Sequence, residues 1–192
     1  MRTTIVFTAL LLLGSTAFSQ DSHTSQYAGQ EQRKIKSLSP DDIKELRRGG
    51  GWGLAKAAEL NGVPGPAHLL EMKDKVPLDQ DQVALISQIW EAMKTEAIAE
   101  GEVLIGLERD LETAFRDGSI TEVLLAEKVN AIAASRARLR IIHLSTHLRT
   151  PDILSGEQID KYNVLRGYAG DPCENIPDGH NAAMWKKHNG CE

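Results

Sequence analysis

Two long stretches of the chain carry apolar residues spaced three and four positions apart, which is the pattern of amphipathic helices. The first stretch covers residues 79–117, and the second follows directly and ends at Pro151. Gly118 interrupts the pattern between them. We therefore predict an all-α protein built on a long antiparallel helical hairpin. Such a hairpin leaves apolar surface exposed, so we expect a dimer or the N-terminal helices to cover it.

Two of the predicted helix starts share one arrangement, Leu-x-x-x-Gln, with a capping residue directly after the leucine. The capping side chain accepts a hydrogen bond from the backbone of the glutamine, and the glutamine side chain reaches back. One motif opens the predicted hairpin and the other follows it. The motif residues are Leu78, Asp79 and Gln82 in the first, and Leu154, Ser155 and Gln158 in the second.

Residues 39–76 form a less regular N-terminal arm that contains a glycine cluster, 49–53. The cluster lacks the Gly-Lys-Ser/Thr ending of a phosphate-binding loop and follows a predicted helix instead of a strand. We interpret it as a hinge at which the backbone approaches a neighbouring helix.

The first residues predict export from the cytoplasm. Arg2 precedes a short apolar run, and small residues follow at Ala17 and Ser19, so we expect a signal peptide, 1–19, cleaved before Gln20. No later segment approaches the roughly 20 apolar residues of a membrane-spanning helix. The expected organisation is a signal peptide (1–19), a flexible N-terminus (20–37), a helical domain (38–168) and a C-terminal tail (169–192), in the periplasm or an equivalent oxidising space.

Composition limits the possible functions. The formal net charge of −5 argues against nucleic acid as the main partner. The chain has no Gly-x-Ser-x-Gly or His-Glu-x-x-His motif and no thiol beside a base, so we do not expect an enzyme. The second long helix is rich in arginine and the first in acidic residues. These charges either pair across the hairpin or border a client-binding surface.

The two cysteines, Cys173 and Cys191, both lie in the tail. In an oxidising compartment they predict one disulfide that closes a small loop. The alternative is a zinc site completed by His180 and His188, but the spacings fit no standard zinc finger.

Glu100 and Arg136 interrupt the apolar seams of the two long helices and lie equally far from Gly118. In a hairpin that turns at Gly118 they face each other. We predict a partly buried ion pair that fixes the register of the two helices with little net gain in stability. The competing interpretation is that both side chains extend to water.

A histidine pair one helical turn apart, His143 and His147, predicts a metal site near the end of the second long helix. The arm can fold back to this end, and it carries further ligand types. Imidazole and carboxylate ligands suit zinc, nickel or copper. Most histidines bind no metal, so satisfied or solvent-facing side chains are the alternative. The candidates for the rest of the ligand set are Glu59, His68, Glu71 and Met93.

The paired capping motifs and residues 57–68 together resemble the Spy/CpxP superfamily, over about 38–168. Asp79 and Ser155 replace the usual threonine of that family's motif, and both are good capping residues. The resemblance implies an elongated helical homodimer that acts as an ATP-independent chaperone for unfolded clients. The alternative that it implies is a heavy-metal sensor or binder, with a membrane sensor or an anti-sigma protein as partner. The nickel and cobalt sensors of this group also take histidines from the arm and from the hairpin.

Overall fold

The computed structural model describes residues 24–188 and residue 191, and the chain divides into two units, Met1–Gln32 and Arg33–Glu192. The expected signal peptide, 1–19, lies outside the described residues. In the first unit the described residues form turns, in which the backbone N–H of Ala28 donates to Ser25 O at 3.0 Å.

The second unit is helical, and the described part of the chain contains no β-strand, so the all-α prediction is confirmed. None of the helices within residues 24–188 combines the length and the apolar character that crossing a membrane requires. In chain order the elements are α1 (Pro40–Arg47), α2 (Lys56–Glu59), α3 (Pro66–Glu71), α4 (Gln80–Arg116), α5 (Glu122–Arg149), the 3₁₀ helix η1 (Pro151–Ile153), α6 (Gly156–Leu165) and α7 (Ala182–His188).

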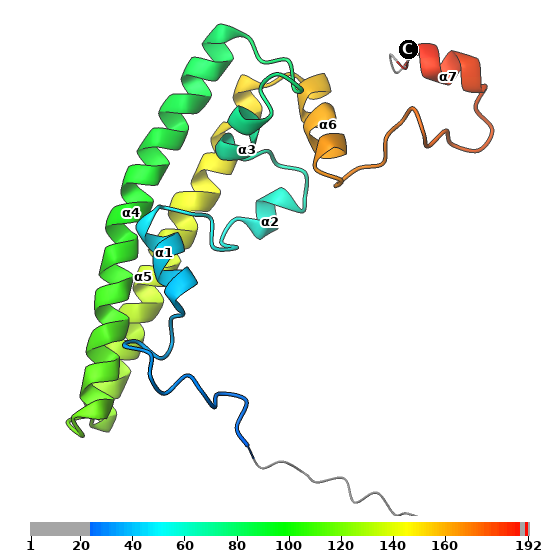
Figure 1. Ribbon diagram of the computed structural model, residues 1–192. Coiled ribbons are helices and arrows are strands. Elements are labelled where there is room, and N and C mark those ends of the chain that lie inside the picture. The colour runs from blue at the N-terminus through cyan, green and yellow to red at the C-terminus, as the bar shows by residue number, and fades with distance from the viewer. Residues whose placement is uncertain (1–23, 189–190, 192) are drawn as a thin grey trace, which may run out of the picture. The chain divides into compact units, whose positions relative to one another are not determined.

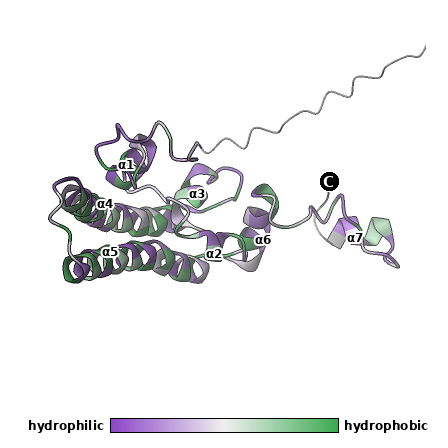
Figure 2. Ribbon diagram, turned by 90° about the horizontal axis from the view of Figure 1, so that it is seen from below, coloured by the Kyte–Doolittle hydropathy of each residue, from purple (hydrophilic) through white to green (hydrophobic). Residues whose placement is uncertain are grey.

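The two long helices, α4 and α5, lie side by side and are joined at one end by residues 117–121 (Figure 1). Each begins at a capped position, since the side chains of Asp79 and Thr121 accept hydrogen bonds from backbone N–H groups three residues on. Hydrophobic and hydrophilic residues alternate along both helices (Figure 2). The buried face of α4 follows the predicted seam and includes Ile86, Met93, Ala97 and Leu104.

The buried face of α5 differs from the predicted stripe. Leu125 and Val129, whose three-and-four spacing extends the apolar pattern toward the start of the helix, are 37% and 45% exposed. The face instead continues through small polar side chains and histidines. Ser135 donates to Glu100, Thr146 donates to His143 O, and His147 Nδ1 bonds to Val63 O of the arm. The buried residues of this face are Ile132, Ser135, Leu139, His143, Thr146 and His147.

Helix α1 packs on α4 at Gly101, where the backbone of the two helices comes close. A Cβ atom on Gly101 would lie 2.6 Å from Leu46 O, which is too near for any side chain. The packed body also begins earlier than the expected boundary at residue 38. Ile35 and Leu38 are almost fully buried in the same core as Met93, so this segment belongs to the body and not to a flexible leader.

The glycine cluster after α1 makes the close approach that the sequence predicts. Gly49 has a φ of +67°, and a Cβ there would lie 2.9 Å from Lys94 O of α4. Trp52 follows with a φ of +43°, and its Nε1–H donates to Asp42 in α1 at 2.8 Å. The segment therefore ties α1 to α4.

Glu100 pairs with Arg138 and not with Arg136, so the predicted ion pair is wrong in its partner. The Arg138 guanidinium donates to Glu100 at 2.9 Å, and the Ser135 hydroxyl donates to the same carboxylate at 2.5 Å. Successive helix residues are rotated by about 100°, so Arg136 leaves the seam that Ser135 occupies and lies over the Trp52 ring. Burial opposes ionisation of Glu100, but the hydrogen bonds from Arg138 and Ser135 outweigh it and lower its pKa.

The two capping motifs dock onto each other. Gln82 and Gln158 each close their own helix cap and also exchange a reciprocal pair of amide hydrogen bonds, both 2.9 Å long. The remaining amide hydrogens donate to the backbone carbonyls of Ile153 and Pro77. The starts of α4 and α6 are thereby locked together beside a second core cluster. The buried members of that cluster are Leu69, Val76, Ile86 and Tyr162.

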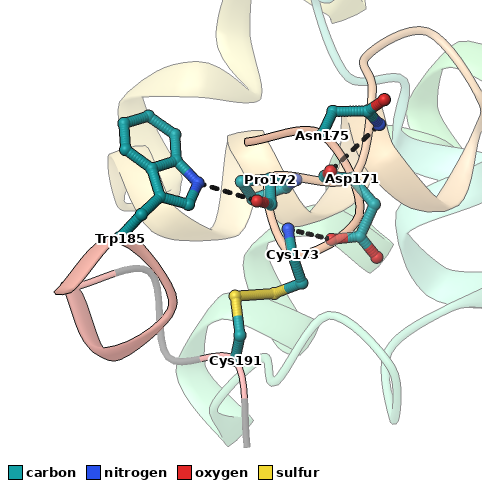
Figure 3. Close-up of a disulfide and its surroundings, with 6 residues drawn as sticks. All are labelled: Asp171, Pro172, Cys173, Asn175, Trp185 and Cys191. Carbon is teal, nitrogen blue, oxygen red and sulfur yellow. Dashed lines mark hydrogen bonds between the residues drawn. A yellow bond between two sulfur atoms is a disulfide. The ribbon is translucent and has the colours of Figure 1, made fainter. Parts of the chain in front are cut away.

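The tail contains the predicted disulfide, with the Cα atoms of Cys173 and Cys191 5.4 Å apart (Figure 3). Both sulfurs are used in this bond, so neither is free to bind zinc in the alternative site. The indole N–H of Trp185 in α7 donates to Pro172 O at 2.7 Å, and the ring of His180 packs edge-on against it. The loop is therefore closed by side-chain contacts as well as by the covalent bond.

Two glycines in the same helix provide a matched test of the α1–α4 contact. We expect Gly101→Ala to lower the free energy of unfolding by about 1–3 kcal/mol, because the added methyl group pushes α1 away. Gly106 meets nothing within 4 Å, so Gly106→Ala should raise it by about 0.5–1 kcal/mol through helix propensity. Urea unfolding of both variants measures this, and a stabilised Gly101→Ala protein would contradict the close approach.

Candidate functional site

The loop between α2 and α3 is held by its backbone. Three consecutive carbonyls, at residues 62–64, each accept a hydrogen bond from a side chain of α6, α5 or the C-cap of α5. Asn163 Nδ2 donates to Gly62 O at 3.1 Å, His147 Nδ1 bonds to Val63 O at 2.9 Å, and the Thr150 hydroxyl donates to Pro64 O. This loop sets the positions of Glu59, the last residue of α2, and of His68 in α3.

Two histidines converge on one oxygen of Glu59. His68 Nε2 lies 3.7 Å from Glu59 Oε1, and His147 Nε2 lies 3.9 Å from the same atom. The side chains of Glu59 and His147 are 13% and 6% exposed, and that of His68 is 35% exposed. Three potential metal ligands from three helices thus meet at a nearly closed point on the surface.

The other ring nitrogens of the two histidines face hydrogen-bond acceptors. His147 Nδ1 faces the Val63 carbonyl, and His68 Nδ1 faces the Glu71 carboxylate at 3.1 Å. Both oxygens only accept, so each Nδ1 carries the proton. In the neutral rings the Nε2 lone pairs then point toward the Glu59 carboxylate. Two nitrogen lone pairs that face a carboxylate repel it. The arrangement is favourable only when a cation, either a proton or a metal ion, lies between them.

The second oxygen of Glu59 binds the C-terminal part of the body. Glu59 Oε2 accepts hydrogen bonds from the hydroxyls of Tyr168 at 2.9 Å and Tyr162 at 3.2 Å, and from Arg166 at 3.4 Å. Tyr162 is fully buried, and burial followed by the nearby charge of Glu59 raises its pKa. Its hydroxyl therefore stays protonated and remains a donor.

Gly65 makes room for this arrangement. A Cβ atom at this position would lie 2.6 Å from His147 Cε1, 2.8 Å from His147 Nε2 and 3.0 Å from Glu59 Oε1. Its φ of −99° is accessible to any residue, so the backbone conformation does not require glycine here. Glycine is required because a side chain would collide with His147 and Glu59. The glycine leaves the lone pair of His147 open toward Glu59.

The remaining predicted ligands are placed differently. His143 is 5% exposed, lies one turn before His147, and its Nε2 has no hydrogen-bond partner. Burial, and then the charge of His147, lower the pKa of His143. Met93 belongs to the first core cluster instead of this group, because its side of α4 faces α1 and the middle of α5. The structure therefore brings together Glu59, His68 and His147, with Glu71 behind His68.

The group fits a divalent transition metal in its donor types. Across residues 24–188 and 191, however, no three His, Cys, Asp or Glu side chains are already arranged to hold such an ion. Neutral imidazoles and a carboxylate are ligands of zinc, nickel and copper. The Nδ1 atom of each histidine already bonds to an oxygen, as the second nitrogen of a metal-bound histidine does. Zinc binds donors of these types at about 2.0–2.2 Å.

Sequence reasoning missed the tyrosines and the arginine that bind Glu59. Tyr162, Arg166 and Tyr168 lie beyond the second capping motif, and no motif marks them. Two weak signals were present. One is a tyrosine on the apolar side of a short helix. The other is that Arg166 and Tyr168 follow it by four and six residues, close to the C-terminal end of that helix. Neither identifies a partner that lies 103 residues or more away in the chain.

Acid should destabilise the body through His143. The pKa of this histidine is lowered in the folded state, so below its unfolded value of about 6.5 the unfolded chain binds more protons and the free energy of unfolding falls with pH. The loss ends below the folded pKa. His143→Gln should remove up to about 1.4 kcal/mol per pH unit of this slope. Urea unfolding with a chelator at pH 7.5–5.0 measures it, with His180→Gln in the tail as the unchanged control.

No protein-family model, curated protein or solved structure matches this chain. The resemblance to the Spy/CpxP superfamily therefore rests on the two capping motifs and on residues 57–68. The function has to be inferred from the side chains themselves, and the convergence of His68 and His147 on Glu59 is the chemical feature with the most defined geometry.

Proposed function

We propose that this protein is an exported, Spy/CpxP-like protein that binds a divalent transition metal and responds to it. The observation that carries the proposal is the pair of Nε2 atoms, from His68 and His147, that face one oxygen of Glu59 at 3.7 and 3.9 Å. In a neutral histidine with its proton on Nδ1, Nε2 carries a lone pair. One metal ion would bind both lone pairs together with the carboxylate.

The donor set favours zinc, nickel or copper over calcium or magnesium. Two imidazoles and one carboxylate provide nitrogen donors, which the hard cations avoid. His143 is one turn away with an unpartnered Nε2, and it supplies a further imidazole if its ring turns toward the site. Export to an oxidising compartment, which the first residues of the chain predict, is supported by the Cys173–Cys191 bond.

Direct titration tests the metal site. We expect isothermal titration at pH 7.5 to give micromolar or tighter binding of zinc or nickel to the mature chain. His147→Ala should weaken binding at least tenfold, because it removes a ligand. Gly65→Ala should do the same by steric displacement of His147, without removing any donor. His180→Ala, which changes a histidine of the tail, is the control. Equal affinity in His147→Ala and in the unmodified chain would refute the site.

A second candidate function, chaperone-like binding of unfolded clients, is supported by an exposed apolar row on α5. The row repeats with the three-and-four spacing of one helix face, and Ile141 and Leu148 in it are 65% and 75% exposed. It lies off the face that packs on α4, because Ser135 and Leu139 of that face are buried. Its exposed residues are Ala134, Ala137, Ile141 and Leu148, and Leu144 between them is half-buried.

The same row is the surface through which two antiparallel hairpins would form the homodimer that the resemblance implies. Neighbouring arginines, Arg140 and Arg149, would add charge recognition of acidic clients or of the acidic α4 of a second copy. Clients and a second copy compete for this surface, so both have to be measured in one experiment.

Changing the row to glutamate separates the two. We expect Ile141→Glu/Leu148→Glu to abolish suppression of client aggregation by the metal-free protein, because both apolar anchors are lost. Gln88→Glu, at an exposed polar position of α4, is the control for added charge. Light scattering gives the mass of each variant. Loss of the dimer with full holdase activity would contradict client binding at this row.

A further inference from the structure

The Glu59 carboxylate has two sides, and the two sides bind different parts of the molecule. Oε1 faces His68 and His147, whereas Oε2 accepts from Tyr162, Tyr168 and Arg166. We propose that Tyr162 and Tyr168 are positioning residues for the metal site, so that metal affinity depends on the docking of residues 162–168 and metal in turn strengthens that docking. The inference rests on the proposed metal-binding function.

The hydroxyl groups determine where the carboxylate points. Glu59 ends the four-residue helix α2, and this short element has no side-chain cap to fix it. The two tyrosine hydroxyls and the arginine hold Oε2 from one side, and this leaves Oε1 directed at the histidines. Tyr162 Oη also lies within 3.5 Å of the Gly65 backbone N–H, next to the space that receives His147. The buried hydroxyl of Tyr162 thus contacts both the Glu59 carboxylate and the backbone beside His147.

Tyr168 is held by the end of α6. Gly167 has a φ of +72°, and the backbone N–H of Tyr168 donates to Asn163 O at 2.8 Å, which closes the turn that ends the helix. Arg166 donates to the Tyr168 hydroxyl at 3.0 Å and lies over its ring at 5.4 Å. The hydroxyl therefore has its acceptor role filled by Arg166, and its proton is directed to Glu59.

Linkage makes the coupling reciprocal. Groups that orient a metal ligand typically change metal affinity 10- to 100-fold when they are removed. By the same free energy, a bound metal stabilises the docked state of the orienting segment. The segment 162–168 leads directly into the tail, so occupancy of the site is communicated to the part of the chain that precedes the disulfide loop.

The test compares two tyrosines that lose only a hydroxyl. Tyr168→Phe should weaken zinc binding about tenfold in isothermal titration and should alter the visible absorption spectrum of the cobalt-loaded protein. The midpoint of thermal unfolding without metal should fall by about 3–6 °C, as for the loss of one hydrogen bond to a charged group. Tyr27→Phe, in the N-terminal unit, should change none of these. Hydrogen exchange of the amides of residues 162–169 should slow at least threefold when zinc is added, and His147→Ala should abolish this effect.

The outcomes separate the coupling from the metal site itself. Unchanged zinc affinity in Tyr168→Phe, or a lowered unfolding midpoint with unchanged affinity, overturns the positioning role while the site stands. Zinc binding by the unmodified chain without any slowing of exchange at residues 162–169 overturns the reciprocal effect. Failure of His147→Ala to weaken zinc binding refutes the metal-binding proposal on which the inference rests.

Discussion

Gln82 and Gln158 hold the start of α4 against the start of α6 through two amide hydrogen bonds that run in opposite directions. Each amide is also used in its own helix cap, so every donor and acceptor of the pair has a partner. The rest of this end of the molecule depends on that contact. It fixes where α6 begins, and the length of α6 then carries Tyr162 to the buried position at which it meets Glu59.

The Glu59 carboxylate is the charged group that this contact helps to position. A nearly buried negative charge is costly unless its oxygens are bound, and here one oxygen has three hydrogen-bond donors. The other oxygen faces the Nε2 atoms of two histidines whose Nδ1 atoms bond to other oxygens. The fold thus satisfies one half of the carboxylate with its own side chains and leaves the other half suited to a cation, which is the physical basis for a binding function at this point.

Periodicity and capping predicted the two long helices almost to their ends, because both signals are local. The apolar spacing of α4 is continuous, and Asp79 marks its start. The arm folds back as predicted, so that Glu59 and His68 lie beside His147, with Glu71 behind His68. The predicted Glu100–Arg136 pair was wrong because counting residues from the turn gives the position of a side chain along the helix axis. It does not give the direction in which the side chain points around that axis. The tyrosine donors to Glu59 were out of reach, since they are set by contacts across more than a hundred residues.

Side chains of α5 and α6 and Thr150 bind the loop at residues 62–64 through its carbonyl oxygens, not through its side chains. Every amino acid offers that oxygen, so the identity of the loop residues is only loosely constrained by these contacts, whereas His147, Thr150 and Asn163 cannot change without leaving a carbonyl unpaired. Over evolutionary time Val63 is therefore free to diverge, whereas Gly62, with a φ of +76°, and Gly65, which leaves space for His147, are held in place. Distant relatives of this protein should be recognisable by the three donors on the far side of the contact and by these two glycines, even where the residue at position 63 differs.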